Sequence, residues 1–113
     1  MSSNDMVDPV KFFGLLGNRR RLLVIGYLSM FEEGDSLEVR DLARVIRGIE
    51  LKKPPHQVTS GEYESAYNGL IQTHLPKLAE CDVIDYTESR KTLSPTHLVY
   101  QYSLLIQTTR ILC

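Results

Sequence analysis

The 113-residue sequence contains only two cysteines, which are too few for a disulfide-stabilised scaffold. A low cysteine content is typical of a reducing compartment, so we expect a cytoplasmic protein. The two cysteines and three histidines also lack the C-x-x-C or H-x-x-x-H spacing of a metal site. Glycine-rich phosphate loops, nucleophile elbows and zinc-protease motifs do not occur. The sequence therefore predicts no metal, no cofactor and no enzymatic activity.

The sequence also lacks an excess of charge of one sign. Its 13 Lys and Arg residues and 14 Asp and Glu residues give a formal net charge of −1. This balance gives no global electrostatic indication of a nucleic-acid partner. The basic residues are nevertheless clustered, because they gather at Arg19–Arg21, at Arg40, Arg44 and Arg47, and at Arg90–Lys91. A neutral total can therefore conceal a basic face.

Long hydrophobic runs are absent as well. The longest run, residues 22–31, follows three arginines and in this respect resembles a signal peptide. Two acidic residues lie upstream of it, however, and no small-residue cleavage site follows. Ten residues are also too few to span a bilayer, which takes about 20. With 42% apolar and 24% charged residues, the chain has the composition of one globular domain without a membrane span.

Helical periodicity dominates the first 80 residues. We expect a short helix from Pro9 to a break at Gly17, and further helices over 19–31, 39–50 and 60–80. A strand stub is expected at Leu37. Thr59-Ser60-Gly61-Glu62 has the spacing of a capping box, which indicates where the last helix begins. Pro76 lies inside that helix and should bend it near residue 72, because proline removes one backbone hydrogen bond.

The last 30 residues favour strands. Asp82 is expected to end the long helix in the left-handed conformation, and residues 83–87 alternate apolar and polar side chains. Residues 98–104 fit either a helix or a strand. We prefer a strand over 98–104 that pairs with 83–87, because Val, Tyr, Thr and Ser are common in the last quarter of the chain. The expected division is a flexible N-terminus over 1–7, a domain over 8–104 and a tail over 105–113.

This order of elements is that of a winged helix-turn-helix, a mainly α fold with a small β-hairpin (α+β). The words Asp41-Leu42-Ala43 and the segment from Thr73 to Ile84 resemble "DLA" and "SRHLKxLxxAGLV" in ArsR-like transcription regulators. The string from Leu16 to Arg21, taken with "QTHLPKLAE" (residues 72–80), is similar to small winged-helix proteins of the haloarchaeal type. The resemblance covers residues 10–87. It implies a DNA-binding regulator, usually dimeric, without enzymatic activity.

Helix 60–80 would then enter the major groove of double-stranded DNA, with the wing over 84–103 on the flanking backbone. Its candidate base contacts are polar or small: Ser65, Asn68, Gly69, Gln72 and Thr73. Candidate backbone contacts are the basic residues Arg19, Arg20, Arg40, Arg44, Lys77, Arg90 and Lys91. The alternatives are a solvated helix face and, for residues 19–21, ion pairs with Glu32, Glu33 or Asp85. His74 lies in the apolar stripe, where a packed core histidine is favoured over a contact.

Apolar residues near both ends suggest a homodimer. Phe12, Phe13, Leu105, Ile106 and Ile111 are the candidate dimerisation residues. They are equally suited to completing the core of a monomer. A second hypothesis for the whole chain is a winged-helix module that binds another protein and has no specific affinity for DNA, since a fold does not fix a function. The near-neutral net charge favours this second hypothesis.

Overall fold

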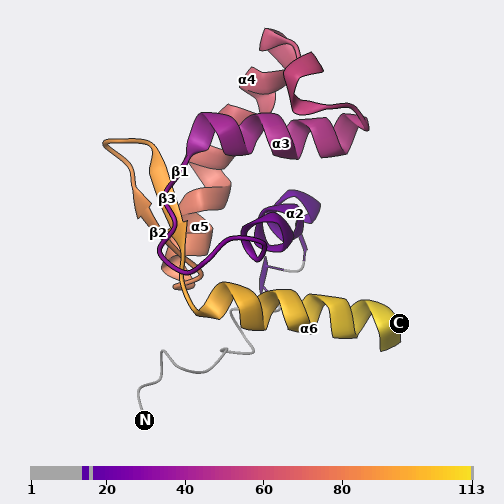
Figure 1. Ribbon diagram of the computed structural model, residues 1–113, viewed down its shortest axis with the longest axis vertical. Helices are drawn as coiled ribbons and strands as arrows, with labels where there is room; N and C mark the ends of the chain where they lie inside the picture. The colour runs from indigo at the N-terminus through magenta and orange to yellow at the C-terminus, as the bar shows by residue number, and fades with distance from the viewer. Residues whose placement is uncertain (1–13, 16, 113) are drawn as a thin grey trace.

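Helices make up most of the chain, and a small antiparallel sheet lies beside them (Figure 1). The computed structural model describes residues 14–15 and 17–112. The elements are α2 (Arg19–Leu28), β1 (Leu37–Glu38), α3 (Val39–Leu51), η2 (Pro55–Gln57), α4 (Ser60–Gly69), η3 (Leu70–His74), α5 (Leu75–Glu80), β2 (Ile84–Thr87), β3 (Thr92–Pro95) and α6 (Leu98–Leu112). The predicted fold class, mainly α with a small β-hairpin, is confirmed. Within the described residues, no helix is long and apolar enough to cross a membrane.

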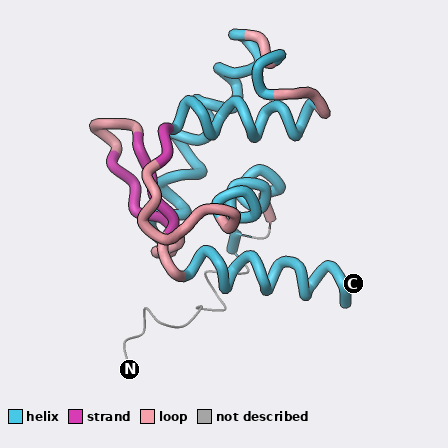
Figure 2. Tube along the Cα trace, in the orientation of Figure 1, coloured by secondary structure: helices cyan, strands magenta, loops and turns pink. Residues whose placement is uncertain are grey.

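The sheet has three strands in the order β1-β3-β2, and all its pairings are antiparallel (Figure 2). β2 and β3 form a hairpin in which Ile84 lies opposite Pro95 and Thr87 opposite Thr92. The predicted stub at Leu37 is confirmed, because Leu37 pairs with Leu93 on the outer side of β3. The stub joins the start of α3 to the hairpin, since the Val39 N–H donates to the Lys91 carbonyl at 2.9 Å.

The helices α2, α3, α5 and α6 enclose one apolar core with the base of the hairpin. α3 begins and ends close to the expected positions, and Val39, Leu42, Ala43 and Ile46 form its buried stripe. Ile49, which has the same helical spacing, is 44% exposed. α2 is shorter than the expected helix over 19–31. It ends at Leu28, because the Met30 and Phe31 N–H groups donate to carbonyls three residues earlier instead of four. Of the short helix expected from Pro9, only positions 14 and 15 lie within the described residues, and both are helical.

The prediction of a strand over 98–104 is wrong, because this segment is the first half of helix α6. Pro95 ends β3, and the Thr96 hydroxyl oxygen accepts the Leu98 N–H at 3.2 Å where the helix begins. Val99, Tyr102 and Ile106 are buried at helical spacing, and α6 packs against α2. Burial of one helical face against α2 has overridden the strand preference of the Val and Tyr residues.

Two predicted boundaries, the end of the wing and the end of the domain, differ in the structure because residues 98–112 form one helix. The hairpin that would act as a wing spans residues 84–95 and not 84–103, since its second strand is β3. The expected boundary between a domain ending at 104 and a tail beginning at 105 falls in the middle of a continuous helix. The expected flexible segment over 1–7 lies outside the described residues. α6 is thus part of the domain, and its inner face completes the core.

Candidate nucleic-acid interface

The predicted helix over 60–80 begins at a complete capping box. The Thr59 N–H donates to Glu62 Oε1 at 2.9 Å, and the Glu62 N–H donates to Thr59 Oγ1 at 3.3 Å. Lys53 Nζ lies 2.6 Å from the same Glu62 carboxylate and, with the backbone bond from Thr59, lowers the pKa of Glu62 to about 2. The capping box satisfies two N–H groups that have no partner inside the helix, which fixes the first turn of α4.

The helix then changes its winding once, in the π-helical turn η3, before continuing as α5. The Leu75 N–H bonds the Leu70 carbonyl, five residues back instead of four. Pro76 follows directly and has no N–H to donate. The irregularity therefore lies where Pro76 predicts it, at residues 70–74. π turns are often found at functional positions of helices.

Most of the predicted base-contact residues lie on the solvent side of this helix. Ser65, Asn68, Gln72 and Thr73 are exposed, and Lys77 is half-buried one turn further on. Four neutral hydrogen-bonding side chains are thus presented across α4 and η3. Together they offer hydroxyl and amide groups of the kind that read base edges.

Gly69 is placed differently from these four residues. It is partly buried, and a Cβ on it would lie 2.9 Å from Arg20 Nη1. The missing side chain therefore makes room for an arginine that arrives from α2. The sequence predicted Gly69 as a base contact and gave no sign of the side chain that it faces in the structure, Arg20.

Arg20 forms a two-bond ion pair with Glu50 near the end of α3. Its Nε and Nη2 donate to the two carboxylate oxygens at 2.8 and 2.7 Å, and Arg47 Nη1 adds a third bond at 3.1 Å. These bonds, the Arg20 bond most of all, hold the pKa of Glu50 below its ordinary value. The suggested intramolecular partners Glu32, Glu33 and Asp85 are wrong for Arg20. No motif in the sequence indicates the true pair, because 30 residues separate its members.

The arginines on the outer face of α3 also have partners. Arg44 lies 4.7 Å above the centre of the Tyr63 ring and donates to the Val58 carbonyl at 3.3 Å. Arg40 Nε donates to Glu38 at 2.7 Å, and both side chains remain exposed. Arg44 thus fixes the loop before α4 to α3. Arg40 is held loosely, because exposed ion pairs contribute little and are easily exchanged for another partner.

A small polar pocket of about 300 Å³ lies between α4 and the tip of the β2–β3 hairpin. It is lined by Glu38, Arg40, Tyr63, Tyr67, Arg90 and Lys91. Three of the predicted backbone contacts, from two distant parts of the sequence, thus line one pocket. Tyr63 and Tyr67 of α4 are the two aromatic residues of this lining. They lie beside these basic residues with ring centres 5.4 Å apart.

His74 is buried, as favoured from the sequence. Its exposed fraction is 7%, and its Nδ1 has no hydrogen-bond partner among the described residues. Burial, together with the nearby charges of Arg21 and Arg20, lowers the pKa of His74. His74 is therefore a packed residue at the end of η3. No group of three His, Cys, Asp or Glu side chains in the described ranges could hold a metal ion.

The structure describes the side chains of only some of the predicted dimerisation residues. Phe12 and Phe13 lie outside the described residues, and so does the side chain of Ile111. Ile106 is buried against the core, whereas Leu105 is 38% exposed and its neighbour Leu104 is 64% exposed. Ile106 thus fits the alternative of completing the monomer core, while Leu104 and Leu105 present apolar surface on the outer side of α6.

Comparison with known proteins identifies a family but no function. Residues 13–94 match the family model of DUF7344, a domain of unknown function. No curated protein and no solved structure matches the chain. The matched region runs from before α2 to the end of β3 and so contains α4 and the hairpin tip. Since the match covers well over half of the sequence, the chain belongs to the DUF7344 family.

Proposed function

We propose that the protein is a DNA-binding transcription regulator with a winged helix-turn-helix domain. The observation that carries the proposal is the pocket at which Arg40, Arg90 and Lys91 meet the first turns of α4. It supports an arrangement in which one helix presents polar side chains and a neighbouring hairpin presents cations. This is how winged helices divide base reading and backbone contact.

The helix α4, with η3, would read base edges in the major groove. Ser65, Asn68, Gln72 and Thr73 are exposed and carry no charge, so they can donate and accept hydrogen bonds without repelling phosphates. Asn and Gln amides form two-bond contacts with adenine. Gly69 takes no part in this proposal, since its bare Cα faces Arg20.

Phosphates of the flanking backbone would bind Arg40, Arg90, Lys91 and Lys77. Arg90 is exposed at the hairpin tip, and Arg40 would exchange Glu38 for a phosphate at small cost. Arg20 and Arg44 act in the proposal as positioning residues. Their side chains hold α2 and the loop before α4 through Glu50, Tyr63 and Val58.

A homodimer would double this contact, as is usual for helix-turn-helix proteins that read two half-sites one helical turn apart. The exposed apolar side chains Leu104 and Leu105 on α6 support this part of the proposal. Light scattering coupled to size-exclusion chromatography tests it, with Leu104→Glu as the variant expected to give a monomer. A wild-type protein that stays monomeric at high concentration would remove the dimer.

A duplex library with a random central region tests DNA binding, because the operator is unknown. Bound sequences are selected by mobility shift, and the affinity of the winner is measured at several salt concentrations. We expect an affinity that falls steeply with salt, since binding releases counterions from the phosphates. Absence of any shift at low salt would overturn the proposal.

Two pairs of substitutions separate base reading from backbone contact. Changing Asn68 and Gln72 to Ala should weaken binding to the selected sequence by about 1–3 kcal/mol for each base that is no longer read. Binding to nonspecific DNA should stay unchanged. Changing Arg90 and Lys91 to Gln should weaken binding to all sequences alike. The slope of log affinity against log salt concentration should become shallower by about one for each phosphate that is no longer neutralised. Gln101→Ala on the exposed side of α6 is the matched control and should have no effect.

The second candidate function is a protein-interaction module without specific DNA binding. The net charge of −1 favours it, because it leaves the molecule without long-range attraction to DNA. The same selection distinguishes the two functions. A module of this kind would enrich no sequence, and the Arg90 and Lys91 substitutions would then change no measured DNA affinity.

A further inference from the structure

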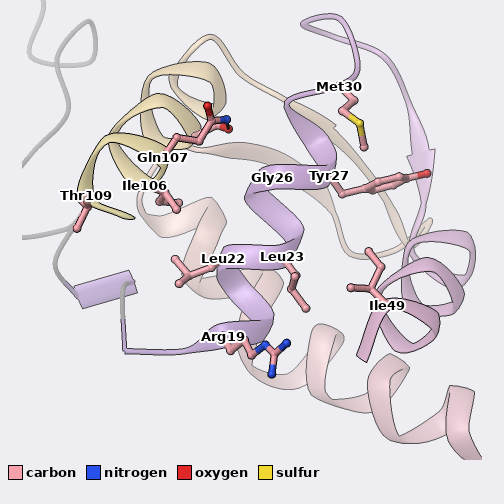
Figure 3. A pocket seen from close by; sticks show the side chains of 11 residues that line it. Arg19, Leu22, Leu23, Gly26, Tyr27, Met30, Ile49, Ile106, Gln107 and Thr109 are labelled. Carbon is pink, nitrogen blue, oxygen red and sulfur yellow. Dashed lines mark hydrogen bonds between the residues drawn. The ribbon is translucent and has the colours of Figure 1, made fainter. Parts of the chain in front are cut away.

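A groove with a volume of about 560 Å³ lies between α2 and α6 (Figure 3). None of the residues to which the proposed function assigns a DNA contact lines it, but Arg19, a candidate backbone contact from the sequence, does. Leu22, Leu23 and Gly26 of α2 lie along its floor, as Figure 3 shows. Ile106, Gln107 and Thr109 of α6 lie on one side of this floor, and Tyr27, Met30 and Ile49 on the other. This volume is within the usual range for small-molecule sites, about 300–1,000 Å³.

The lining is mostly apolar, and several of its large side chains are open to solvent. Met30 is 74% exposed and Ile49 is 44% exposed, although both are large hydrophobic side chains. Gly26 adds to the open space, because a Cβ placed on it would meet no atom within 4 Å. Apolar side chains in a concave site gain free energy when an apolar ligand displaces the water around them.

One charge is present at this groove. Arg19 lies at the end of the floor where α2 begins, and it is the one charged side chain among the described lining residues. It is exposed, and it forms no ion pair or hydrogen bond with any residue that the structure describes. No carboxylate from the described part of the chain lines the groove. Three other polar lining groups have partners, since Gln107 donates to the Ser103 hydroxyl, Ser103 donates to Ser29 and Thr109 donates to the Leu105 carbonyl.

We propose that this groove binds a small amphipathic carboxylate, with its apolar body over Leu22, Gly26 and Ile106 and its carboxylate on Arg19. The apolar lining accepts a hydrocarbon chain or a ring, and the guanidinium can bind a carboxylate through two parallel hydrogen bonds. The complementary charge selects an anion over a neutral or cationic molecule of the same shape. The proposal does not rest on DNA binding.

Decanoate is a suitable probe below its micelle-forming concentration, with decanol and decyltrimethylammonium as neutral and cationic counterparts. Binding to the full chain is followed by the shifts of backbone amide signals in two-dimensional ¹H–¹⁵N spectra. We expect decanoate to shift the signals of Leu22, Gly26 and Ile106 and to bind more tightly than either counterpart. Equal affinity for all three molecules, or shifts that spread over the whole surface, would overturn the proposal.

Two charge-removing variants test the role of Arg19. Arg19→Gln should weaken decanoate binding roughly fivefold or more, the usual scale for a partly exposed ion pair with good geometry, and should change decanol binding less than about twofold. Arg90→Gln removes the same charge at the hairpin tip and should leave decanoate binding unchanged. If both variants weaken binding equally, net charge is responsible and the assignment to Arg19 is wrong.

Two further variants test the position of the ligand. Gly26→Leu fills the open floor and should abolish binding of both decanoate and decanol. Ile49→Glu introduces a carboxylate from an exposed position and should weaken decanoate selectively. Thermal unfolding checks that both variants fold. If decanoate does not bind and Gly26→Leu converts a dimer to a monomer, the groove holds a second copy of the chain and the ligand proposal fails.

Discussion

Asp82 adopts a conformation that glycine occupies more readily than any other residue. Its φ is +61°, and it lies just after α5. The Val83 N–H donates to the Leu78 carbonyl and the Asp82 N–H to the Ala79 carbonyl, both at 3.0 Å, which is the Schellman pattern. The buried side chains of Val83 and Leu78 supply the apolar contact that usually accompanies it. The prediction of a left-handed residue at this position is therefore confirmed.

Replacing Asp82 by glycine should stabilise the protein. Gly adopts a positive φ without the steric cost that an L side chain incurs, so Asp82→Gly should raise the free energy of unfolding by about 0.5–1 kcal/mol. Asp82→Val should lower it, since β-branched residues tolerate this region least. Urea denaturation monitored by circular dichroism measures both changes. A glycine variant less stable than the wild type would show that the Asp82 side chain contributes more than its conformation costs.

Gly48 and Gly26 should respond in opposite ways to the same substitution. A Cβ on Gly48 would lie 2.7 Å from the backbone oxygen of Lys53, whereas one on Gly26 would meet nothing. Gly26→Ala should therefore raise the free energy of unfolding by about 0.5–1 kcal/mol through helix propensity. Gly48→Ala should lower it by about 1–3 kcal/mol, because the loop after α3 must move. Thermal unfolding of the two variants side by side measures the difference. Equal effects would mean that this loop yields at no cost.

At the scale of helices and strands, the sequence predicted correctly the features that depend on neighbouring residues. The capping box, the effect of Pro76 and the pattern of α3 each depend on residues within one or two turns, and each lies where the sequence predicts it. The strand predicted over residues 98–104, which belong to α6, was wrong because their conformation is decided by a distant part of the chain. The Val and Tyr residues of α6 favour a strand locally, and only the face of α2 on which Tyr102 and Ile106 pack makes the helix more stable. A pattern of neighbouring residues cannot reveal this contact, because α2 and α6 are far apart along the chain.

The capping box gives a prediction at the same scale. Thr59→Ala should lower the free energy of unfolding by about 1 kcal/mol, because the Glu62 N–H loses its acceptor at the start of α4. Ser60→Ala, one residue further on, is exposed and should be close to neutral. Chemical denaturation compares the two variants, and hydrogen exchange of the α4 amides shows whether the loss is local. If both variants lose the same stability, the effect does not come from the cap.

The geometry of the candidate site depends on contacts between distant segments of the chain, and most helices and strands do not. Its polar helix face could be read from spacing alone, as Asn68 and Gln72 show. The cluster of Arg20, Glu50 and Gly69 could not, because these residues come from three helices and meet only when the core has formed. For the same reason the formal charge of −1 does not describe the charge of any one surface. It counts arginines that are paired inside the molecule together with Arg90, which is exposed at the hairpin tip.

Glu50 makes this dependence measurable, because its carboxylate joins α2 to α3 through Arg20 and Arg47. Its pKa is lowered in the folded protein, so its stabilisation is fully present above the unfolded value near 4.5. The stabilisation is lost as the pH falls through the lower, folded pKa. Glu50→Gln should therefore cost about 1–3 kcal/mol at pH 7 and progressively less below pH 4.5, since it leaves two partly buried guanidinium groups without their anion.

Urea denaturation of the wild type and Glu50→Gln between about pH 7 and pH 3 tests this expectation. His74, whose pKa is also lowered, reduces the stability of both proteins as the pH falls below its unfolded value near 6.5. The Glu50 carboxylate raises the pKa of His74, so this loss is larger in Glu50→Gln, and the test is the decrease of the stability difference below pH 4.5. Glu80→Gln replaces an exposed carboxylate and should leave the difference near zero at every pH. A Glu50→Gln difference that stays constant down to the most acidic pH would show that packing, and not the ion pair, is what the carboxylate contributes between these helices.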